Sequence, residues 1–267
     1  MRRNPSGMSA TEAEIADIVR AAAHERRQIA PFQDMSLPAA YRVARLVREA
    51  REKHGERVVG RKIGFTNRGI WDEYAVHAPI WGYVYDRTLH EISEPARADD
   101  FLEPRIEPEI VFGLARPIGA HMDLAEIAAA IGWVAHGFEI VQSLYAGWRF
   151  AAADTVAAFG LHGGLWIGPR RPLAPGEAGR LESFEITLAR DGVEVDRGQG
   201  RNVLDGPLQA LAHLARALAG DPGHPPLSAG EIVTTGTLTR AFPIQPGEVW
   251  TTALHGLDLP GARLIVA

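Results

Sequence analysis

Apolar side chains recur at helical spacing in the first 57 residues. Ser9-Ala10-Thr11-Glu12 has the form of a capping box, and apolar residues follow it every three or four positions, which predicts a helix. Pro31 interrupts this pattern, and Ser36 with Pro38 then has the form of a second helix start. Its apolar stripe runs into a charged stretch that ends at Gly55. The pattern predicts a helical N-terminal segment over residues 1–57.

From residue 58 onward, apolar and polar residues mostly alternate, and this period predicts strands. Segments of this kind are 58–66, 78–85, 104–112, 133–141, 160–168, 181–191 and 231–266, with helices predicted between them at 122–131 and 207–218. Asp191-Gly192 is a typical hairpin turn. Helices near the N-terminus, followed along the chain mainly by strands, predict an α+β fold. In this fold, segment 1–57 packs on a mixed β domain that comprises residues 58–267.

Composition narrows the class of protein. The chain has 267 residues, 46% of them apolar and 23% charged, which is ordinary for a globular protein with a real core. A net charge of −5 does not support nucleic-acid binding. The absence of cysteine excludes disulfides, zinc–thiolate sites and a cysteine nucleophile. Without a membrane-length apolar run or a signal peptide, the expected location is the cytoplasm.

The strand at 104–112 carries the first candidate site. Glu107 and Glu109 are two residues apart, so in a strand their carboxylates share one face at a separation of roughly 7 Å. If that face is buried, the pair needs a cation or a shared proton. The alternative is a half-exposed strand with a polar face. Glu139, alone in an apolar strand, fits an exposed or arginine-paired residue. Together with Glu107 and Glu109 it adds a third carboxylate, and such an oxygen-rich set favours Mg²⁺ or Mn²⁺ over zinc.

Lysine is rare in this chain, which draws attention to Lys62. Only Lys53 and Lys62 occur among 28 basic residues. Lys53 lies in a charged stretch and is interpreted as a solvated side chain. Lys62 lies in an apolar strand, where it is either a snorkelling lysine or a partly desolvated amine that acts as acid, base or carboxylate anchor.

Other polar residues are less specific. Asp154 is interpreted as a helix or turn cap, or as a residue that holds a second layer of hydrogen bonds. His136 and His162 fit structural histidines better than metal ligands. Residues 235–239 offer hydroxyls and backbone N–H groups for a carboxylate, and the chain has neither a phosphate loop nor a dinucleotide-binding motif.

These pieces, taken in order, resemble one known family. The segments are Lys62-Ile63-Gly64-Phe65-Thr66, Ile106-Glu107-Pro108-Glu109-Ile110, Glu139-Ile140-Val141 with Ser143, Trp148, Asp154-Thr155-Val156-Ala157, Asn202-Val203-Leu204 and residues 235–239. Together they resemble the 2-keto-4-pentenoate hydratase and 4-oxalocrotonate decarboxylase branch of the fumarylacetoacetate hydrolase superfamily. The similarity extends from about residue 40 to the end of the chain.

The resemblance implies both a fold and a chemistry. The fold is a helical N-terminal segment packed on a mixed β-sandwich or β-roll of the superfamily's C-terminal-domain type. Glu107, Glu109 and Glu139 would hold Mg²⁺ or Mn²⁺, which would bind the carboxylate and 2-oxo oxygen of a 2-oxo acid and stabilise an enolate. Lys62 corresponds to the family's active-site lysine and would hold the charged end of the substrate and move a proton. The expected substrate-binding residues are Trp81, Gly82, Gln142, Asp154, Phe159, His162 and Thr237.

Two departures from the family pattern bear on the reaction. The similar hydratases have a carboxylate two residues before the glycine that corresponds to Gly82, where this chain has Ile80. That carboxylate is expected to handle protons during hydration, so Ile80 favours decarboxylation. The chain also has Ala157-Ala158-Phe159-Gly160 where family members commonly have Ala-Asp-Asn-Ala.

The leading hypothesis is a metal-dependent lyase on a small 2-oxo acid, with hydration of a 2-hydroxydienoate slightly favoured over decarboxylation of a 4-oxalocrotonate-type substrate. The alternatives are a hydrolase that cleaves the C–C bond of an acylpyruvate, with His77 or His162 as base, and a non-catalytic metal-binding homologue. The resemblance also implies a homo-oligomer of at least two copies. No nucleic-acid or membrane partner is expected.

Overall fold

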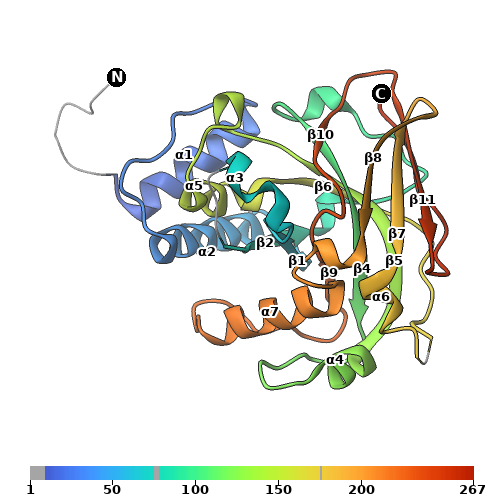
Figure 1. The fold of residues 1–267 in the computed structure, drawn as a ribbon. Helices are drawn as coiled ribbons and strands as arrows, with labels where there is room; N and C mark the ends of the chain where they lie inside the picture. Colours follow the sequence, from blue (N-terminus) through green and yellow to red (C-terminus); the bar gives the residue numbers. More distant parts are fainter. Residues whose placement is uncertain (1–9, 75–77, 175) are drawn as a thin grey trace.

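The computed structural model describes residues 10–74, 78–174 and 176–267 (Figure 1). Its α-helices are α1 (Glu12–His24), α2 (Leu37–Lys53), α3 (Trp71–Tyr74), α4 (Leu124–Ala130), α5 (Ala152–Ala157), α6 (Arg180–Ser183) and α7 (Pro207–Ala219). The first strands are β1 (Val58–Gly64), β2 (Ile80–Tyr85), β3 (Leu89–Glu91), β4 (Arg105–Leu114), β5 (Ile131–Val141) and β6 (His162–Ile167). The later strands are β7 (Glu185–Arg190), β8 (Val193–Gln199), β9 (Ile232–Thr234), β10 (Phe242–Pro243), β11 (Val249–His255) and β12 (Arg263–Ile265).

The N-terminal helices begin at specific caps. Helix α1 is capped by Thr11, whose hydroxyl accepts from the N–H of Glu14 while the Glu14 carboxylate accepts from the N–H of Thr11. The capping box is therefore Thr11–Glu14, two residues later than predicted, and Ser9 lies outside the described residues. Ser36 caps α2 and Pro38 lies in its first turn, as predicted.

The larger sheet is mixed, with strand order β2-β1-β9-β4-β5-β6-β3, and β10 pairs with β4. Strand β9 pairs parallel with β1 and antiparallel with β4, which brings the early strand β1 close to the central pair β4–β5. A second sheet has the order β12-β11-β7-β8. The mixed α+β fold predicted for the chain is confirmed.

The two sheets pack against each other through apolar residues on one face of β4 and β5. Ile106, Phe138 and Ile140 belong to one buried cluster with Leu188, Trp250 and Leu264 of the second sheet. Side chains alternate along a strand, so the odd-numbered neighbours Glu107, Glu109 and Glu139 point to the opposite face. This packing therefore turns the three carboxylates away from the second sheet.

Helices α1, α2 and α5 are grouped beside β1 and β2 (Figure 1). Their buried cluster includes Val19, Val43 and Val156, together with Ile80 of β2. The described part of segment 1–57, from residue 10 on, therefore packs on the rest of the chain through a shared core, and the boundary at residue 57 stays a prediction. No helix in the described ranges is long and apolar enough to cross a membrane.

The segment 181–191 differs from its predicted strand at its start. Arg180–Ser183 forms the short helix α6, and the strand β7 begins at Glu185. The predicted hairpin turn is confirmed, because Asp191 and Gly192 connect the paired residues Arg190 and Val193 with φ values of 51° and 79°. Two consecutive positive φ values suit the asparagine, aspartate and glycine residues preferred in such two-residue loops.

Candidate metal centre

Three carboxylates converge on one face of β4 and β5. Glu107 lies directly opposite Glu139 in the antiparallel pairing, and Glu109 follows two residues along the same face of β4. One oxygen from each of the three carboxylates lies within 4.8 Å of the others. Glu109 and Glu139 are fully buried, whereas Glu107 borders a pocket and is partly exposed. The structure thus brings together the three residues that the sequence proposes as metal ligands.

Two of these carboxylates are each anchored at one oxygen by a neutral hydrogen-bond donor. Oε2 of Glu109 accepts from the N–H of Gly236 over 2.8 Å, and Oε1 of Glu139 lies 2.7 Å from Nδ1 of His162. Of the other oxygens, Oε1 of Glu109 is buried without a hydrogen-bond partner, and Oε2 of Glu139 faces the ammonium of Lys62 at 3.1 Å. A buried carboxylate oxygen without a donor is costly, and a hard divalent cation is the partner that suits it. The donor set therefore fits Mg²⁺ or a similar ion.

The protonation of the carboxylates follows from burial and mutual repulsion. Burial raises the pKa of Glu107 to about 7, and burial together with the neighbouring carboxylates Glu139 and Glu107 raises the pKa of Glu109 well above its usual value. For Glu139, burial acts in the same direction, but Lys62 and His162 outweigh it and lower the pKa. Three ionised carboxylates and one ammonium carry a net charge of −2, which a divalent cation would neutralise.

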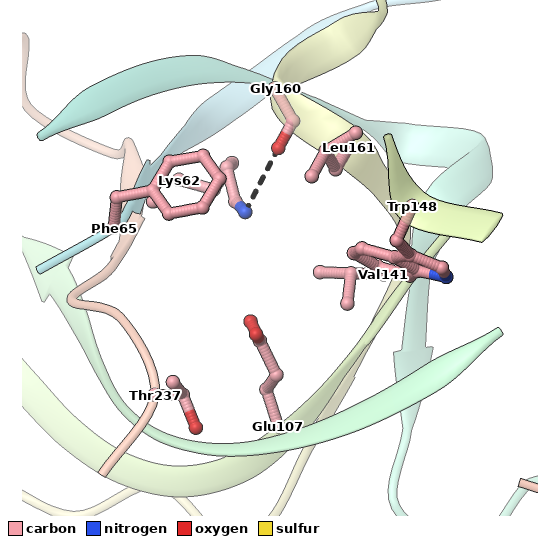
Figure 2. Close-up of a pocket in the computed structure, with 9 residues that line it drawn as sticks. Lys62, Phe65, Glu107, Val141, Trp148, Gly160, Leu161 and Thr237 are labelled. Atoms are coloured by element: carbon pink, nitrogen blue, oxygen red, sulfur yellow. Dashed lines mark hydrogen bonds between the residues drawn. The ribbon is translucent and has the colours of Figure 1, made fainter. Parts of the chain in front are cut away.

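Lys62 places its amine over this cluster from β1. Its Nζ donates to the carbonyl of Gly160 over 3.1 Å (Figure 2). The same Nζ lies 3.1 Å from Oε2 of Glu139. The side chain is buried, so it is not a snorkelling surface lysine. Burial acts to lower the pKa of Lys62, but the charges of Glu139, Glu107 and Glu109 outweigh this effect and raise it. The amine is therefore held as an ammonium.

A small pocket of about 30 Å³ lies between Lys62 and Glu107 (Figure 2). It is lined by Lys62, Gly64, Phe65, Glu107, Val141, Trp148, Gly160, Leu161 and Thr237. Of the expected substrate-binding residues, Thr237 lines it, and its hydroxyl donates to the carbonyl of Thr239. Phe65 and Trp148 lie within the family-like segments of the sequence. The carbonyl of Gly160 carries no signal in the sequence, because any residue supplies one.

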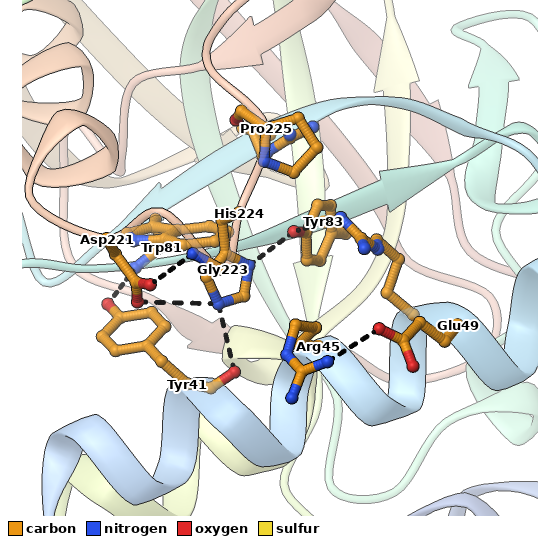
Figure 3. Close-up of polar contacts among 11 residues, drawn as sticks. Tyr41, Arg45, Glu49, Trp81, Tyr83, Asp221, Gly223, His224 and Pro225 are labelled. Atoms are coloured by element: carbon orange, nitrogen blue, oxygen red, sulfur yellow. Dashed lines mark hydrogen bonds and ion pairs between the residues drawn. The ribbon is translucent and has the colours of Figure 1, made fainter.

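Trp81 and Gly82 lie on opposite faces of β2. Trp81 stacks on Tyr41, with ring centroids 5.0 Å apart, and its edge meets His224 (Figure 3). It therefore belongs to an aromatic cluster beneath α2 and does not line the pocket. Gly82 pairs with Lys62 on the pocket side, where a Cβ would lie 2.6 Å from the carbonyl oxygen of Phe159.

Ile80 lies near the amine. It pairs with Gly64, and a Cβ added to Gly64 would lie 3.2 Å from Cγ1 of Ile80 and 3.4 Å from Nζ of Lys62. Ile80 is buried and apolar, so the position at which the resemblance leads us to expect a carboxylate offers no proton-transfer group here.

Asp154 is committed to the backbone. Its two oxygens accept from the N–H groups of Phe32 and Ala151 over 2.8 and 2.7 Å. The first contact ties the loop between α1 and α2 to helix α5, and the second caps α5. This matches the interpretation of Asp154 as a cap, and Asp154 is not among the residues that line the pocket.

The remaining expected residues, Gln142, Phe159 and His162, border a different and more open cavity of about 730 Å³ next to α1 and α2. Of the two histidines considered as a hydrolytic base, His162 is held by Glu139 and by the hydroxyl of Thr88. His77 lies outside the described residues.

Comparison with known proteins places this geometry in context. Residues 83–259 match the family model described as fumarylacetoacetate (FAA) hydrolase C-terminal. The chain is 32% identical to 2-hydroxyhexa-2,4-dienoate hydratase of Comamonas testosteroni over 238 residues, covering 86% of this chain and 89% of the relative. It is 30% identical to 2-keto-4-pentenoate hydratase of Paraburkholderia xenovorans over 251 residues, covering 91% of each.

A solved structure is similar over nearly the whole chain. It is 4-oxalocrotonate decarboxylase from Pseudomonas putida G7 complexed with magnesium and adipate. The TM-score is 0.87 at 26% sequence identity, covering 96% of this chain and 97% of the other.

Proposed function

Because this chain belongs to the fumarylacetoacetate hydrolase family, we propose that it is a divalent-metal-dependent lyase that acts on a small 2-oxo acid in the manner of the 2-keto-4-pentenoate hydratases. One observation carries the proposal. Oε1 of Glu109 is buried without a hydrogen-bond partner in a cluster of three carboxylates, and a buried ammonium lies 3.1 Å from Glu139 in the same cluster. Hydratases and decarboxylases among its relatives place the enzyme among the lyases.

The residues have distinct roles in this proposal. Glu107, Glu109 and Glu139 would hold the cation, which supplies Lewis-acid withdrawal of electrons from the 2-oxo acid. Lys62 would attract the charged end of the substrate, and because its side chain lines the pocket, its ammonium could donate a proton to the reacting carbon chain. The apolar residues around the pocket would exclude water from this charged centre.

Magnesium is the first choice of metal, since a similar structure is a magnesium complex. The proposal extends to Mn²⁺, because both ions take oxygen ligands. A homo-oligomer of at least two copies and a cytoplasmic location also belong to the proposal, as the family resemblance implies.

Decarboxylation is the second candidate reaction, and Ile80 favours it. Hydration of a diene needs a group that delivers a proton as water adds, and the buried Ile80 beside Lys62 lacks one. Loss of CO₂ needs only electron withdrawal at the 2-oxo acid.

The test is turnover by the purified protein with Mg²⁺. With 2-hydroxypenta-2,4-dienoate, hydration removes the diene absorbance, and with 2-oxohex-3-enedioate, decarboxylation releases CO₂. Glu109→Gln should abolish both turnover and the metal-induced rise in Tm. Failure of the wild-type protein to turn over either substrate, or any other 2-oxo acid, would reject the lyase proposal.

A further inference from the structure

The segment between α5 and β6 adopts an unusual backbone. Phe159, Gly160 and Leu161 have φ values of 61°, 64° and 64° in succession. Left-handed backbone costs a residue with a side chain roughly 1–2 kcal/mol, so such a run persists only where its surroundings impose it. The contacts that this backbone conformation allows with Lys62 and Glu139 account for its cost.

Two residues in or next to this segment, Gly160 and His162, each contact one residue of the metal centre. The carbonyl of Gly160 accepts from Nζ of Lys62, and two residues later Nδ1 of His162 lies 2.7 Å from Oε1 of Glu139. The side chains of His162 and Glu139 are 1% and 0% exposed, so water does not compete for this contact. An ionised carboxylate only accepts, and Nδ1 therefore carries the proton.

The ring of His162 is fixed from its other side as well. Its Nε2 lies 2.8 Å from Oγ1 of Thr88, whose position is held by the backbone N–H and carbonyl of Tyr85. The imidazole thus bridges the end of β2 and the carboxylate on β5. A carboxylate that is fixed at one oxygen has little freedom to rotate. The contact at Oε1 therefore also fixes the direction in which Oε2 of Glu139 points.

We propose that His162 is a positioning residue of the metal centre: it holds Oε1 of Glu139 so that Oε2 faces the cation. This inference rests on the proposed metal-dependent function and adds a residue that does not itself bind the cation. Partners that orient a metal ligand typically change metal affinity about 10- to 100-fold when they are removed. The same segment orients Lys62 through the carbonyl of Gly160. One turn of backbone therefore fixes the positions of both the Lys62 amine and the Glu139 carboxylate.

The test measures Mn²⁺ affinity in three variants of His162 by calorimetry or by electron paramagnetic resonance. In His162→Asn the amide nitrogen takes the place of Nδ1 and still donates to Glu139. In His162→Gln the amide reaches the place of Nε2 and leaves Glu139 without its donor, and in His162→Leu both contacts are lost. We expect the Asn variant to bind Mn²⁺ within a few-fold of the wild type and the other two to bind about 10- to 100-fold more weakly.

His224→Leu is the matched control, because His224 is also buried, but its contacts are the hydroxyl of Tyr83, the carbonyl of Tyr41 and Asp221, and not Glu107, Glu109 or Glu139. It should lower Tm and leave Mn²⁺ affinity unchanged. Equal affinities in His162→Asn and His162→Gln would overturn the inference, even if His162→Leu does not fold. A wild-type protein that binds neither Mn²⁺ nor Mg²⁺ would instead reject the proposed function itself.

Discussion

The backbone N–H of Gly236 donates to Oε2 of Glu109 over 2.8 Å. This contact depends on the absence of a side chain at residue 236. Gly236 has φ of 98°, and a Cβ at this position would lie 1.7 Å from Oγ1 of Thr66. The glycine therefore lets the loop after β9 approach β1 and reach the carboxylate on β4.

Gly236→Ala should weaken both folding and metal binding. Gly247→Ala is the matched control, because Gly247 has φ of 92° and a Cβ added there would meet no heavy atom within 4 Å. The control should lose roughly 1–2 kcal/mol of unfolding free energy from the backbone conformation alone. Gly236→Ala should lose about 1–3 kcal/mol more from steric overlap. Denaturant unfolding and Mg²⁺ titration check this, and equal losses would contradict the role given to Gly236.

Lys62→Met should separate metal binding from turnover. The substitution keeps an unbranched side chain and removes a positive charge 3.1 Å from Oε2 of Glu139. Turnover should fall about 10²- to 10⁴-fold, the usual range for loss of a proton-transfer group. Metal affinity should stay the same or increase, because the ammonium repels a cation. Lys53→Met changes the other lysine, which is exposed, and should alter neither quantity.

Ile80→Asp should shift the balance between the two reactions. A carboxylate at this position would lie beside Gly64 and Lys62, where it can exchange a proton with the substrate chain. We expect the ratio of hydration to decarboxylation to rise relative to the wild type. Ile80→Asn has the same shape without the acid and should not raise the ratio. An equal change in both variants would show that polarity or volume, and not proton transfer, is responsible.

His136 should make stability depend on pH. Its Nδ1 donates to the carbonyl of Glu109, and its Nε2 contacts the hydroxyl of Thr252 in the second sheet. Burial lowers the pKa of His136 to about 4, below its usual value of 6.5. Above pH 6.5 the ring is neutral in both states, and as the pH falls toward 4 the unfolded chain binds a proton that the folded chain does not. The folded state should lose about 3 kcal/mol over this window.

Comparing the wild type with His136→Gln isolates this contribution from those of the buried carboxylates. The measurement is the free energy of unfolding between pH 7 and pH 4 in the presence of chelator. The variant should show a shallower dependence on pH, and parallel curves would refute the assignment.

Local spacing was sufficient to predict that the three candidate metal ligands lie together. Glu107 and Glu109 share a face in any regular strand, and Glu139 follows on a strand long enough to pair with theirs. The helices were likewise predictable from apolar period and caps, although Thr11 rather than Ser9 caps the first, because both hydroxyl residues precede an acidic residue at capping distance.

The pocket could not be predicted in the same way. Trp81 and Gly82 are adjacent in a strand and lie on opposite faces, so only one of them is on the same face as Lys62, and the sequence alone does not say which. The contacts of His162 with Glu139 and of Asp154 with Phe32 join residues far apart in the chain. Such contacts depend on how the strands and helices pack, so no local sequence pattern predicts them.

The position of β9 between β1 and β4 has a consequence for synthesis of the protein on the ribosome. Lys62 pairs with Thr234, and the carboxylate of Glu109 is held by Gly236, so residues 232–236 join the strand of the amine to the strands of the acids. All the proposed ligands emerge well before that strand does. The three carboxylates can already meet through the direct pairing of β4 with β5, whereas Lys62 joins their sheet after β9 has been made. The amine is therefore expected to reach the proposed metal centre late in synthesis of the chain.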